Sequence, residues 1–396
     1  MNLNQIIKLQ LDGLDLNLTT PNNGRWTSKG TWIDQKIVPE VVSHNIRCIL
    51  DFISHENTSF TRAEIERSRY YIETYTGIFG KPDIQATRNE SDKFISHTLK
   101  LLASAQILEI TNSNNRSFKY KVKNIELLKL LKDERNTFIF LKNYIEKVLK
   151  DSGIFSWFEE FFAKQTDGTI QASDYILLRN RYISFSKDHL GHEKPLHPRR
   201  ILPKILNTLA AEKGLRGTKM GQLSRDNITL RDMIYRITNS RDSALPRGMS
   251  RSEFQNITEP SIDSRIQRAK DSVKERHDFK SEINNEYANV AHHILLKHEH
   301  GDFAAERENL IVLTPNQHNL KAHPNSNFRI ADPDYQKLCL IKKFENIKLS
   351  HELNDGFYNL PTFIDMLNAL YREEYGLLES VSTFDEVQTY LDENFA

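Results

Sequence analysis

The sequence predicts an α+β protein that is mostly helical and is divided into several domains. Its 396 residues exceed the length of a typical single domain, which is roughly 100–200 residues. Apolar residues recur at helical spacing in several long stretches, whereas short strand-like runs occur in two pairs, at 107–123 and 290–313. The hydrophobic fraction of 38% and the charged fraction of 27% are typical of a globular protein.

Composition and cysteine usage exclude several classes of protein. No apolar run approaches the roughly 20 residues that span a bilayer, and the N-terminal residues lack the basic start and apolar core of a secretory signal. We therefore expect a cytoplasmic protein without membrane contact. The two cysteines, Cys48 and Cys339, are far apart in sequence, which excludes a disulfide framework and a Cys-x-x-Cys structural zinc site.

Residues 1–125 are expected to begin with three helices. Apolar residues at helical spacing predict one helix over 44–56 and another over 92–105. The segment Thr61-Arg62-Ala63-Glu64 has the form of a capping box, in which the Thr and Glu side chains satisfy the free backbone N–H groups at a helix start. It predicts a third helix between the other two.

A two-stranded ribbon is predicted directly after these helices. The runs 107–111 and 116–123 are separated by an Asn-rich turn, and the second run alternates between aromatic or aliphatic side chains and basic ones. Three helices followed by a ribbon is the pattern of a winged helix-turn-helix, whose basic wing contacts DNA phosphates. A small packing module with a solvated ribbon is the alternative. The candidate DNA contacts on this ribbon are Lys119, Lys121 and Lys123.

Residues 126–254 are expected to form a helical and basic region. Apolar stripes predict helices over 126–165, and between residues 179 and 219 the chain carries ten Lys or Arg against three acidic residues. Such a local excess favours contact with a DNA backbone, although an ordinary solvated surface is the alternative. The candidate DNA contacts in this region are Arg199, Arg200, Arg216 and Lys219.

The C-terminal residues 331–396 are expected to form an acidic helical cap. From residue 351 onwards, the sequence contains ten acidic residues and a single Lys or Arg, which is Arg372. The net charge of the whole chain is only +1. The local excess of basic residues at 179–219 and of acidic residues from 351 onwards nevertheless shows that the two kinds of charge are segregated along the sequence. This segregation indicates a basic binding face that is balanced by an acidic part elsewhere.

The most specific pattern is a group of His and Asn side chains on two apolar runs and the short polar segment that follows them. Its members are His292, His293, Asn309, His318, Asn319 and His323. Imidazole groups bind metal ions, and a neutral imidazole accepts a proton near pH 7. One histidine alone is usually an ordinary surface or core residue, but four at this spacing indicate a metal-dependent hydrolytic site.

Simple geometry leaves one ligand of this group open. Side chains alternate along a strand, so His292 and His293 can serve one site only at a bend or at a strand end. On an ideal helix, Asn319 and His323 are one turn apart, whereas His318 and His323 are about 140° apart. Either His318 or Asn319 is therefore the partner of His323.

The segment from Ala291 to Asn327 resembles the HNH core, or ββα-metal finger, of type II restriction endonucleases. The likeness includes a final histidine followed by proline and an Asn-rich turn, His323-Pro324-Asn325-Ser326-Asn327. This resemblance places an HNH nuclease core at 255–330. It implies an enzyme that hydrolyses double-stranded DNA at a short specific sequence, in restriction of foreign DNA, and that in some cases acts as a homodimer.

The resemblance also implies roles for individual residues. His293 would be the general base, His292 and His318 metal ligands, and His323 a ligand of the metal or of the scissile phosphate, while Asn309 would hold the connecting loop. The implied cofactor is a divalent metal, Mg²⁺ by analogy, with Mn²⁺ or Ni²⁺ as substitutes. This chain has His292 where many members have Asp, which leaves the metal open because imidazole suits transition metals better than magnesium.

Two alternative functions are compatible with the same sequence. One is an HNH endonuclease that requires a modified base, for which an aromatic pocket would be needed; Trp26, Trp32 and Trp157 are the candidates. The other is a winged-helix DNA-binding regulator in which the His finger is only a structural metal site. The complete set of histidines favours the nuclease over the regulator.

Overall fold

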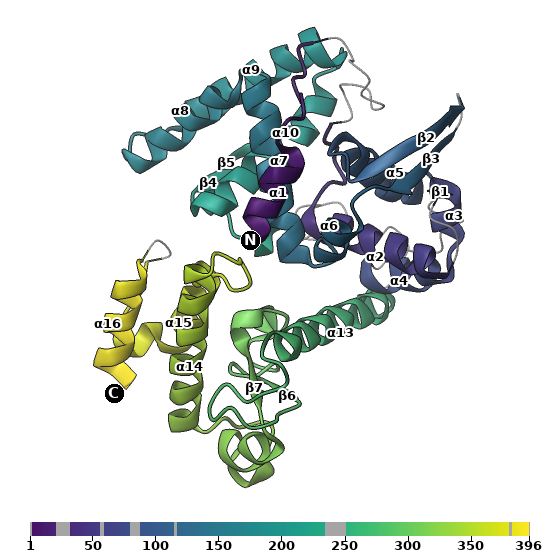
Figure 1. Ribbon diagram of the computed structural model, residues 1–396. Coiled ribbons are helices and arrows are strands. Elements are labelled where there is room, and N and C mark those ends of the chain that lie inside the picture. Colours follow the sequence, from purple (N-terminus) through teal and green to yellow (C-terminus); the bar gives the residue numbers. More distant parts are fainter. Residues whose placement is uncertain are drawn as a thin grey trace. The chain divides into compact units, whose positions relative to one another are not determined.

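The computed structural model describes residues 2–20, 32–55, 59–79, 88–114, 117–233, 251–379 and 382–395. The chain divides into two compact units, Met1–Phe254 and Gln255–Ala396, and each is described by itself (Figure 1). Both are mostly helical and carry small antiparallel sheets, which confirms the predicted α+β class. No helix of the described residues is long and apolar enough to cross a membrane.

The first unit begins with helices that surround a small sheet. Its elements up to residue 122 are α1 (Leu3–Leu11), α2 (Pro39–His55), β1 (Ser59–Thr61), α3 (Arg62–Arg67), α4 (Arg69–Phe79), α5 (Arg88–Ser104), β2 (Leu108–Asn114) and β3 (Ser117–Val122). The predicted helices 44–56 and 92–105 correspond to α2 and α5, both of which begin earlier than expected. The predicted capping box is confirmed, since the Glu64 carboxylate accepts from the Thr61 N–H at 2.6 Å and the Thr61 hydroxyl accepts from the Glu64 N–H at 3.3 Å.

The predicted ribbon is present but has a third strand. The strand order is β1-β3-β2, and all pairs are antiparallel. The predicted alternation on β3 is confirmed: Tyr120 is 3% exposed and stacks on Phe60 of β1, whereas Lys119 and Lys121 are exposed. Strand β1 is only three residues long, which explains why periodicity did not reveal it.

The remainder of the first unit is helical and ends in a hairpin. It contains α6 (Ile125–Leu130), α7 (Glu134–Asp151), α8 (Phe155–Thr166), α9 (Ala172–Leu190), α10 (Leu196–Lys213), β4 (Arg216–Lys219) and β5 (Gln222–Asn227). Helix α7 packs against α1, α2, α8 and α10, and one continuous hydrophobic core extends from Ile7 to Met233. The residues predicted as a winged-helix-like module and as a scaffold therefore share a single core.

The second unit carries the histidine group on a hairpin between helices. Its elements are α13 (Arg251–Arg276), which starts just before the boundary between the units, β6 (Val290–His293), β7 (Leu310–Leu313), α14 (Pro333–Glu352), α15 (Leu360–Tyr375) and α16 (Phe384–Phe395). Strands β6 and β7 are antiparallel, with His292 opposite Ile311 and His293 opposite Leu310. Residues of β7 pack with α14 and α15 in one core, so the hairpin has a rigid support.

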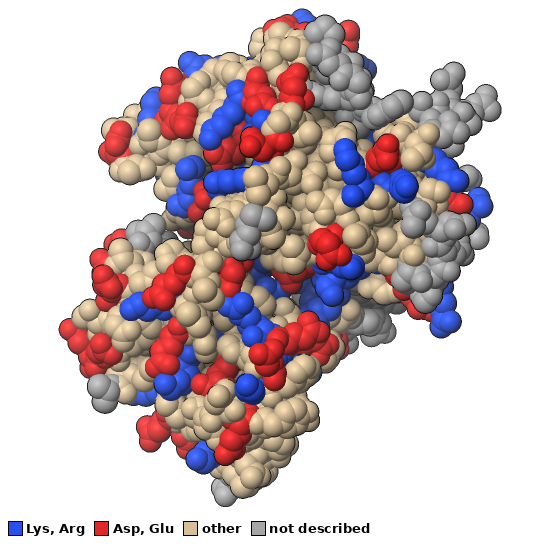
Figure 2. Space-filling view, in the orientation of Figure 1, with Lys and Arg blue, Asp and Glu red and all other residues tan. Residues whose placement is uncertain are grey.

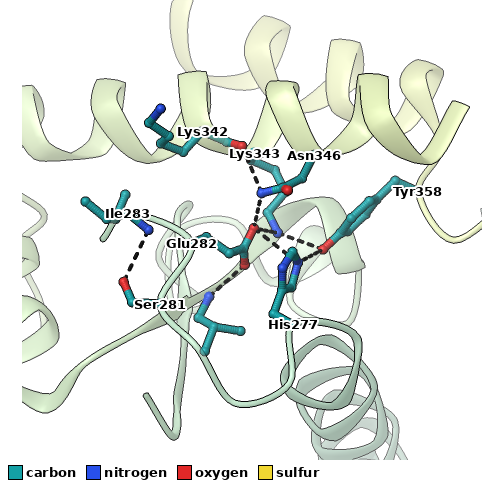
Figure 3. A network of polar contacts seen from close by, with 9 residues as sticks. His277, Ser281, Glu282, Ile283, Lys342, Lys343, Asn346 and Tyr358 are labelled. Atoms are coloured by element: carbon teal, nitrogen blue, oxygen red, sulfur yellow. Dashed lines mark hydrogen bonds and ion pairs between the residues drawn. The ribbon is translucent and has the colours of Figure 1, made fainter. Parts of the chain in front are cut away.

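A buried polar network holds the loop before β6 against β7 and α14 (Figure 3). The Glu282 carboxylate accepts hydrogen bonds from the Val312 N–H at 2.8 Å and from the Asn346 amide at 2.9 Å, and it pairs with the Lys343 ammonium at 2.7 Å. Neither charged side chain is exposed, and the Lys343 ammonium also donates to the Tyr358 hydroxyl at 3.0 Å. Because each charge is paired and hydrogen-bonded, the network tolerates burial.

Replacing Lys343 by methionine should strongly destabilise the protein. The substitution leaves the Glu282 carboxylate buried without its counter-charge, and breaking a buried pair in this way costs about 3–5 kcal/mol. The matched control is Lys342→Met, since Lys342 pairs with Glu345 near the surface, and a surface pair contributes at most about 1 kcal/mol. Urea unfolding measures both variants; equal losses would contradict the assigned role of Glu282.

The acidic residues predicted to form a C-terminal cap lie on the surface of helices. Residues 333–395 form α14 to α16, and acidic side chains predominate over α15 and α16 in the view of Figure 2. The exposed members include Glu373, Glu374, Asp385, Glu386, Asp392 and Glu393. In the same view, acidic and basic side chains are interleaved over α8 and α9, where Arg181 pairs with Glu160 and Lys164 with Asp174.

Candidate metal centre

The two adjacent histidines lie at the end of β6. Strand β6 ends at His293, and one further bond to the segment before β7 follows, from the Ile294 N–H to the Asn309 carbonyl at 2.9 Å. His292 is 5% exposed, whereas His293 is half-buried. The strand end that the sequence required is therefore present, and both imidazoles line one pocket.

A π-helical turn places the other two histidines. Gln317–Ala322 forms this turn, and His323 follows it in an extended conformation. The turn starts at a cap in which the side-chain amide oxygen of Gln317 accepts from the Thr314 N–H at 2.8 Å and from the Ser281 hydroxyl at 2.7 Å. In a π-helix, residues five apart are bonded neighbours. This explains why His318 and His323 meet, although they would diverge on an α-helix.

Three imidazoles converge into a group that can hold a metal ion. One potential ligand nitrogen each of His292, His318 and His323 lies within 4.8 Å of the other two. The ring planes are nearly perpendicular in pairs, at 72°, 82° and 84°. Such an arrangement leaves space between the nitrogens for an ion. Of the two residues left open by helix geometry, His318 belongs to this histidine group.

Hydrogen bonds fix which nitrogen two of these histidines present. The His318 Nδ1–H donates to the Asn319 amide oxygen at 2.9 Å, and the His323 Nδ1–H donates to the Ile330 carbonyl at 2.9 Å. In a neutral imidazole, this leaves Nε2 as the lone-pair nitrogen. Metal-ligating histidines commonly have their second nitrogen bound in this way, which orients the ring. The residues present thus fit a metal ion.

Burial disfavours the charged form of two of these histidines, His292 and His318. Burial lowers the pKa of His292 well below its ordinary value, and the neighbouring His318 and His323 lower it further. The pKa of His318 is lowered mainly by burial as well. Metal binding requires deprotonated imidazoles, and the lowered pKa values of His292 and His318 favour that form.

His293 has the geometry of a general base. Its Nε2–H donates to the Ala304 carbonyl at 3.0 Å, so the lone pair is on Nδ1. Burial, with Lys270 as the next cause, lowers the pKa of His293 to about 4. The imidazole is therefore neutral near pH 7 and can accept a proton. His293 lies outside the three-histidine group.

Asn309 holds the loop between the strands. It is fully buried, and its amide oxygen accepts from the Leu295 N–H at 2.6 Å. Its amide nitrogen donates to the Leu295 carbonyl at 3.1 Å and to the Phe303 carbonyl at 3.2 Å. It lies at the end of a short 3₁₀ turn just before β7 rather than within the strand. Asn309 therefore holds the carbonyl of Phe303, the residue before Ala304, whose own carbonyl accepts from His293.

The pocket also contains side chains that the sequence analysis missed. Its volume is about 380 Å³, and Lys270, Lys297 and Phe328 line it beside the histidines. Phe328 is 55% exposed and stacks on His318. Lys270 lies on α13, whose Ala269 and Val273 pack against β7. Ala269 and Val273 are spaced as on one face of a helix, and Lys270 lies at the edge of that face. This signal could have identified Lys270 only if β7 had been known to be the element that packs on this face.

The predicted DNA-contacting residues all lie in the first unit. Lys119, Lys121 and Lys123 are exposed on or directly after β3, and Arg199 and Arg200 are exposed on α10.

Two further candidates already have partners within the protein. The Arg216 guanidinium donates to the Ser224 carbonyl at 2.7 Å, and Lys219 pairs with Asp232 at 2.9 Å. Both contacts lie on or beside the β4–β5 hairpin and occupy part of the donor capacity of each side chain.

The tryptophans offer no described aromatic pocket. Trp32 is 2% exposed, and Trp157 packs against the same core of the first unit. Trp26 lies outside the described residues. The two cysteines, Cys48 and Cys339, are both buried and belong to different units, so they form no Cys metal site.

Comparisons with known proteins provide no further assignment. They find no matching family model, no similar curated protein and no similar solved structure. The functional argument therefore depends on the geometry of the histidine group and its pocket.

Proposed function

We propose that this chain is a divalent-metal-dependent endonuclease of the HNH type that hydrolyses double-stranded DNA at a short specific sequence, as type II restriction enzymes do. One observation carries the proposal. Three histidines converge in a group that could hold a metal ion, and a fourth, His293, lies beside them with one ring nitrogen bonded to a backbone carbonyl and the other available as a base. A metal site with an adjacent, separately oriented base is what phosphodiester hydrolysis requires.

The chain's own residues would perform the proton transfer. His293 Nδ1 would take a proton from water while the water oxygen attacks the phosphorus and the bond from the phosphorus to the leaving oxygen breaks. The Ala304 carbonyl would keep the ring oriented during this step. Asn309 positions that carbonyl through its bond to Phe303. When bound at His292, His318 and His323, a divalent ion would stabilise negative charge on the phosphate and on the leaving oxygen.

The donor set bears on the choice of metal. All three ligands are imidazoles, which suit transition metals, whereas magnesium prefers oxygen ligands. We propose that Mn²⁺ or Ni²⁺ supports activity at least as well as Mg²⁺. This proposal departs from the Mg²⁺ that the resemblance to HNH endonucleases implies, because many members of that family have an aspartate where this chain has His292.

Sequence recognition would reside in the first unit. The ββα-metal unit at 291–327 is small and would bind a phosphate rather than distinguish many bases, so other residues must contact the DNA grooves. The exposed lysines of β3 are the best placed candidates for backbone contacts. Cutting of both strands would require two active sites, and we propose a homodimer on DNA for that purpose.

Removal of charge from the β3 lysines should weaken binding to all DNA sequences. We expect the triple variant Lys119→Gln, Lys121→Gln and Lys123→Gln to lose affinity and to reduce the salt slope of binding by roughly one unit per lost phosphate contact. Titration of labelled duplex DNA at several salt concentrations measures both. An unchanged salt slope would exclude these lysines from the interface.

Plasmid digestion separates the proposal from its alternatives. Purified protein is incubated with methylated and unmethylated plasmids and a divalent metal, and the ends of the products are sequenced. Cleavage of unmodified DNA at one short sequence supports the hypothesis of a type II restriction endonuclease. Cleavage of modified DNA alone would indicate a modification-dependent nuclease, and sequence-specific binding without cleavage would indicate a regulator with a structural metal site.

A further inference from the structure

The pocket around the histidine group carries basic side chains without an acidic partner in its lining. Two lysines and five histidines contribute to it, and none of its described lining residues is Asp or Glu. The three-histidine group that could hold a metal likewise contains no carboxylate. A divalent ion bound there would keep its full charge, since its protein ligands contribute none.

Lys270 adds a fixed positive charge to this pocket. It projects from α13, is half-buried, and is among the causes that lower the pKa of His292, His293 and His318. Within the described residues, no ion pair of Lys270 is present, whereas Lys297 pairs with Asp263 and Lys274 with Asp271, each at 2.8 Å. Lys270 therefore differs from its neighbours in having no acidic partner there.

A lysine beside a site for a dication is unfavourable unless an anion lies between them. Like charges a few ångströms apart repel strongly in a partly buried pocket. A phosphodiester carries one negative charge on two non-bridging oxygens, so one oxygen can face the metal and the other can accept from an ammonium group. The pocket volume of about 380 Å³ is sufficient for such a group.

We propose that Lys270 couples metal binding to substrate binding at this site. In the free protein its charge opposes the metal; in the complex it donates to a non-bridging oxygen of the scissile phosphate, and the bound phosphate then favours the metal. By linkage, the metal favours the phosphate to the same extent. This inference rests on the proposed nuclease function, and Lys270 would be a catalytic residue that contacts the substrate.

The test measures Mn²⁺ affinity with and without a simple phosphodiester. Mn²⁺ binding to the full chain is followed by electron paramagnetic resonance, alone and with saturating dimethyl phosphate. In the wild type, the phosphodiester should tighten Mn²⁺ binding by at least about fivefold. In Lys270→Gln, which keeps most of the side chain, Mn²⁺ alone should bind roughly three- to tenfold more tightly, and the effect of dimethyl phosphate should disappear.

Two control variants make the result specific to the charge and its position. Lys270→Arg should retain the coupling, and Lys274→Gln, one turn further along α13 and outside the pocket lining, should match the wild type. A general loss of structure would weaken Mn²⁺ binding, which is opposite to the expected change. Weaker Mn²⁺ binding in Lys270→Gln, or coupling that persists in it, would overturn the inference.

The same measurement distinguishes this inference from the proposed function. Wild-type protein that binds Mn²⁺ and cuts DNA but shows no response to dimethyl phosphate overturns the role of Lys270 alone. Wild-type protein that binds no divalent metal overturns both. In a cleavage assay, Lys270→Gln should also lose at least about tenfold in rate, which corresponds to one charge-assisted hydrogen bond.

Discussion

Replacement of His293 by alanine should reduce DNA cleavage by about 10²–10⁴-fold while DNA binding and metal binding persist. The imidazole is the group we assign to take the proton from water, and it lies outside the three-histidine group. Single-turnover cleavage of a plasmid measures the rate, and a titration with Mn²⁺ measures the metal site in the same preparation.

A nearby histidine provides the control for this variant. His300 lies in the loop after β6, outside the pocket lining, and His300→Ala should cut at nearly the wild-type rate. Wild-type activity of His293→Ala would show that another group activates the water. Loss of metal binding in His293→Ala would instead indicate that this residue is a fourth ligand.

Replacement of His318 by alanine should lower metal affinity by more than about 100-fold and silence cleavage. It removes one of the three proposed ligands, whereas loss of an outer partner of a metal ligand costs roughly 10–100-fold in affinity. The matched variant is Asn319→Ala, which removes only the acceptor that orients the His318 ring. Calorimetric titration with Mn²⁺ or Ni²⁺ ranks the two variants. A larger loss for Asn319→Ala would reverse the assignment.

Local rules predicted those parts of the fold that depend on neighbouring residues. The Thr61–Glu64 capping box and the alternation around Tyr120 are encoded within a few residues, so sequence alone was sufficient. Strand β1 was not predicted because three residues carry no periodicity, and its strand character depends on pairing with β3. Likewise, the start of α2 at Pro39 depends on burial of its first turn, which a short apolar pattern does not show.

The histidines that converge in the structure were predicted from the sequence, but their arrangement was not. The residue types and spacing indicated His292, His318 and His323, yet ideal helix geometry left His318 undecided. The π-helical turn that brings His318 to His323 is stabilised by contacts of Gln317 with Ser281, far away in sequence. Local propensity contains no information on such a contact.

Contacts between residues far apart in the sequence could not be predicted, because local sequence patterns contain no information on them. Lys270 is separated from His292 by a loop, and Glu282 meets Lys343 only when α14 folds back onto the hairpin. Charged residues in a single sequence look alike whether they are solvated or buried. Burial and pairing, which decide their role, are properties of the fold.

The most direct test of the metal-dependent nuclease is cleavage of supercoiled plasmid after exhaustive chelation and then after re-addition of metal. We expect the chelated protein to be inactive, and addition of Mn²⁺ or Ni²⁺ to restore cutting in the wild type but not in His292→Ala. Cutting that survives chelation, or a protein that remains inactive with every divalent metal, would contradict the account.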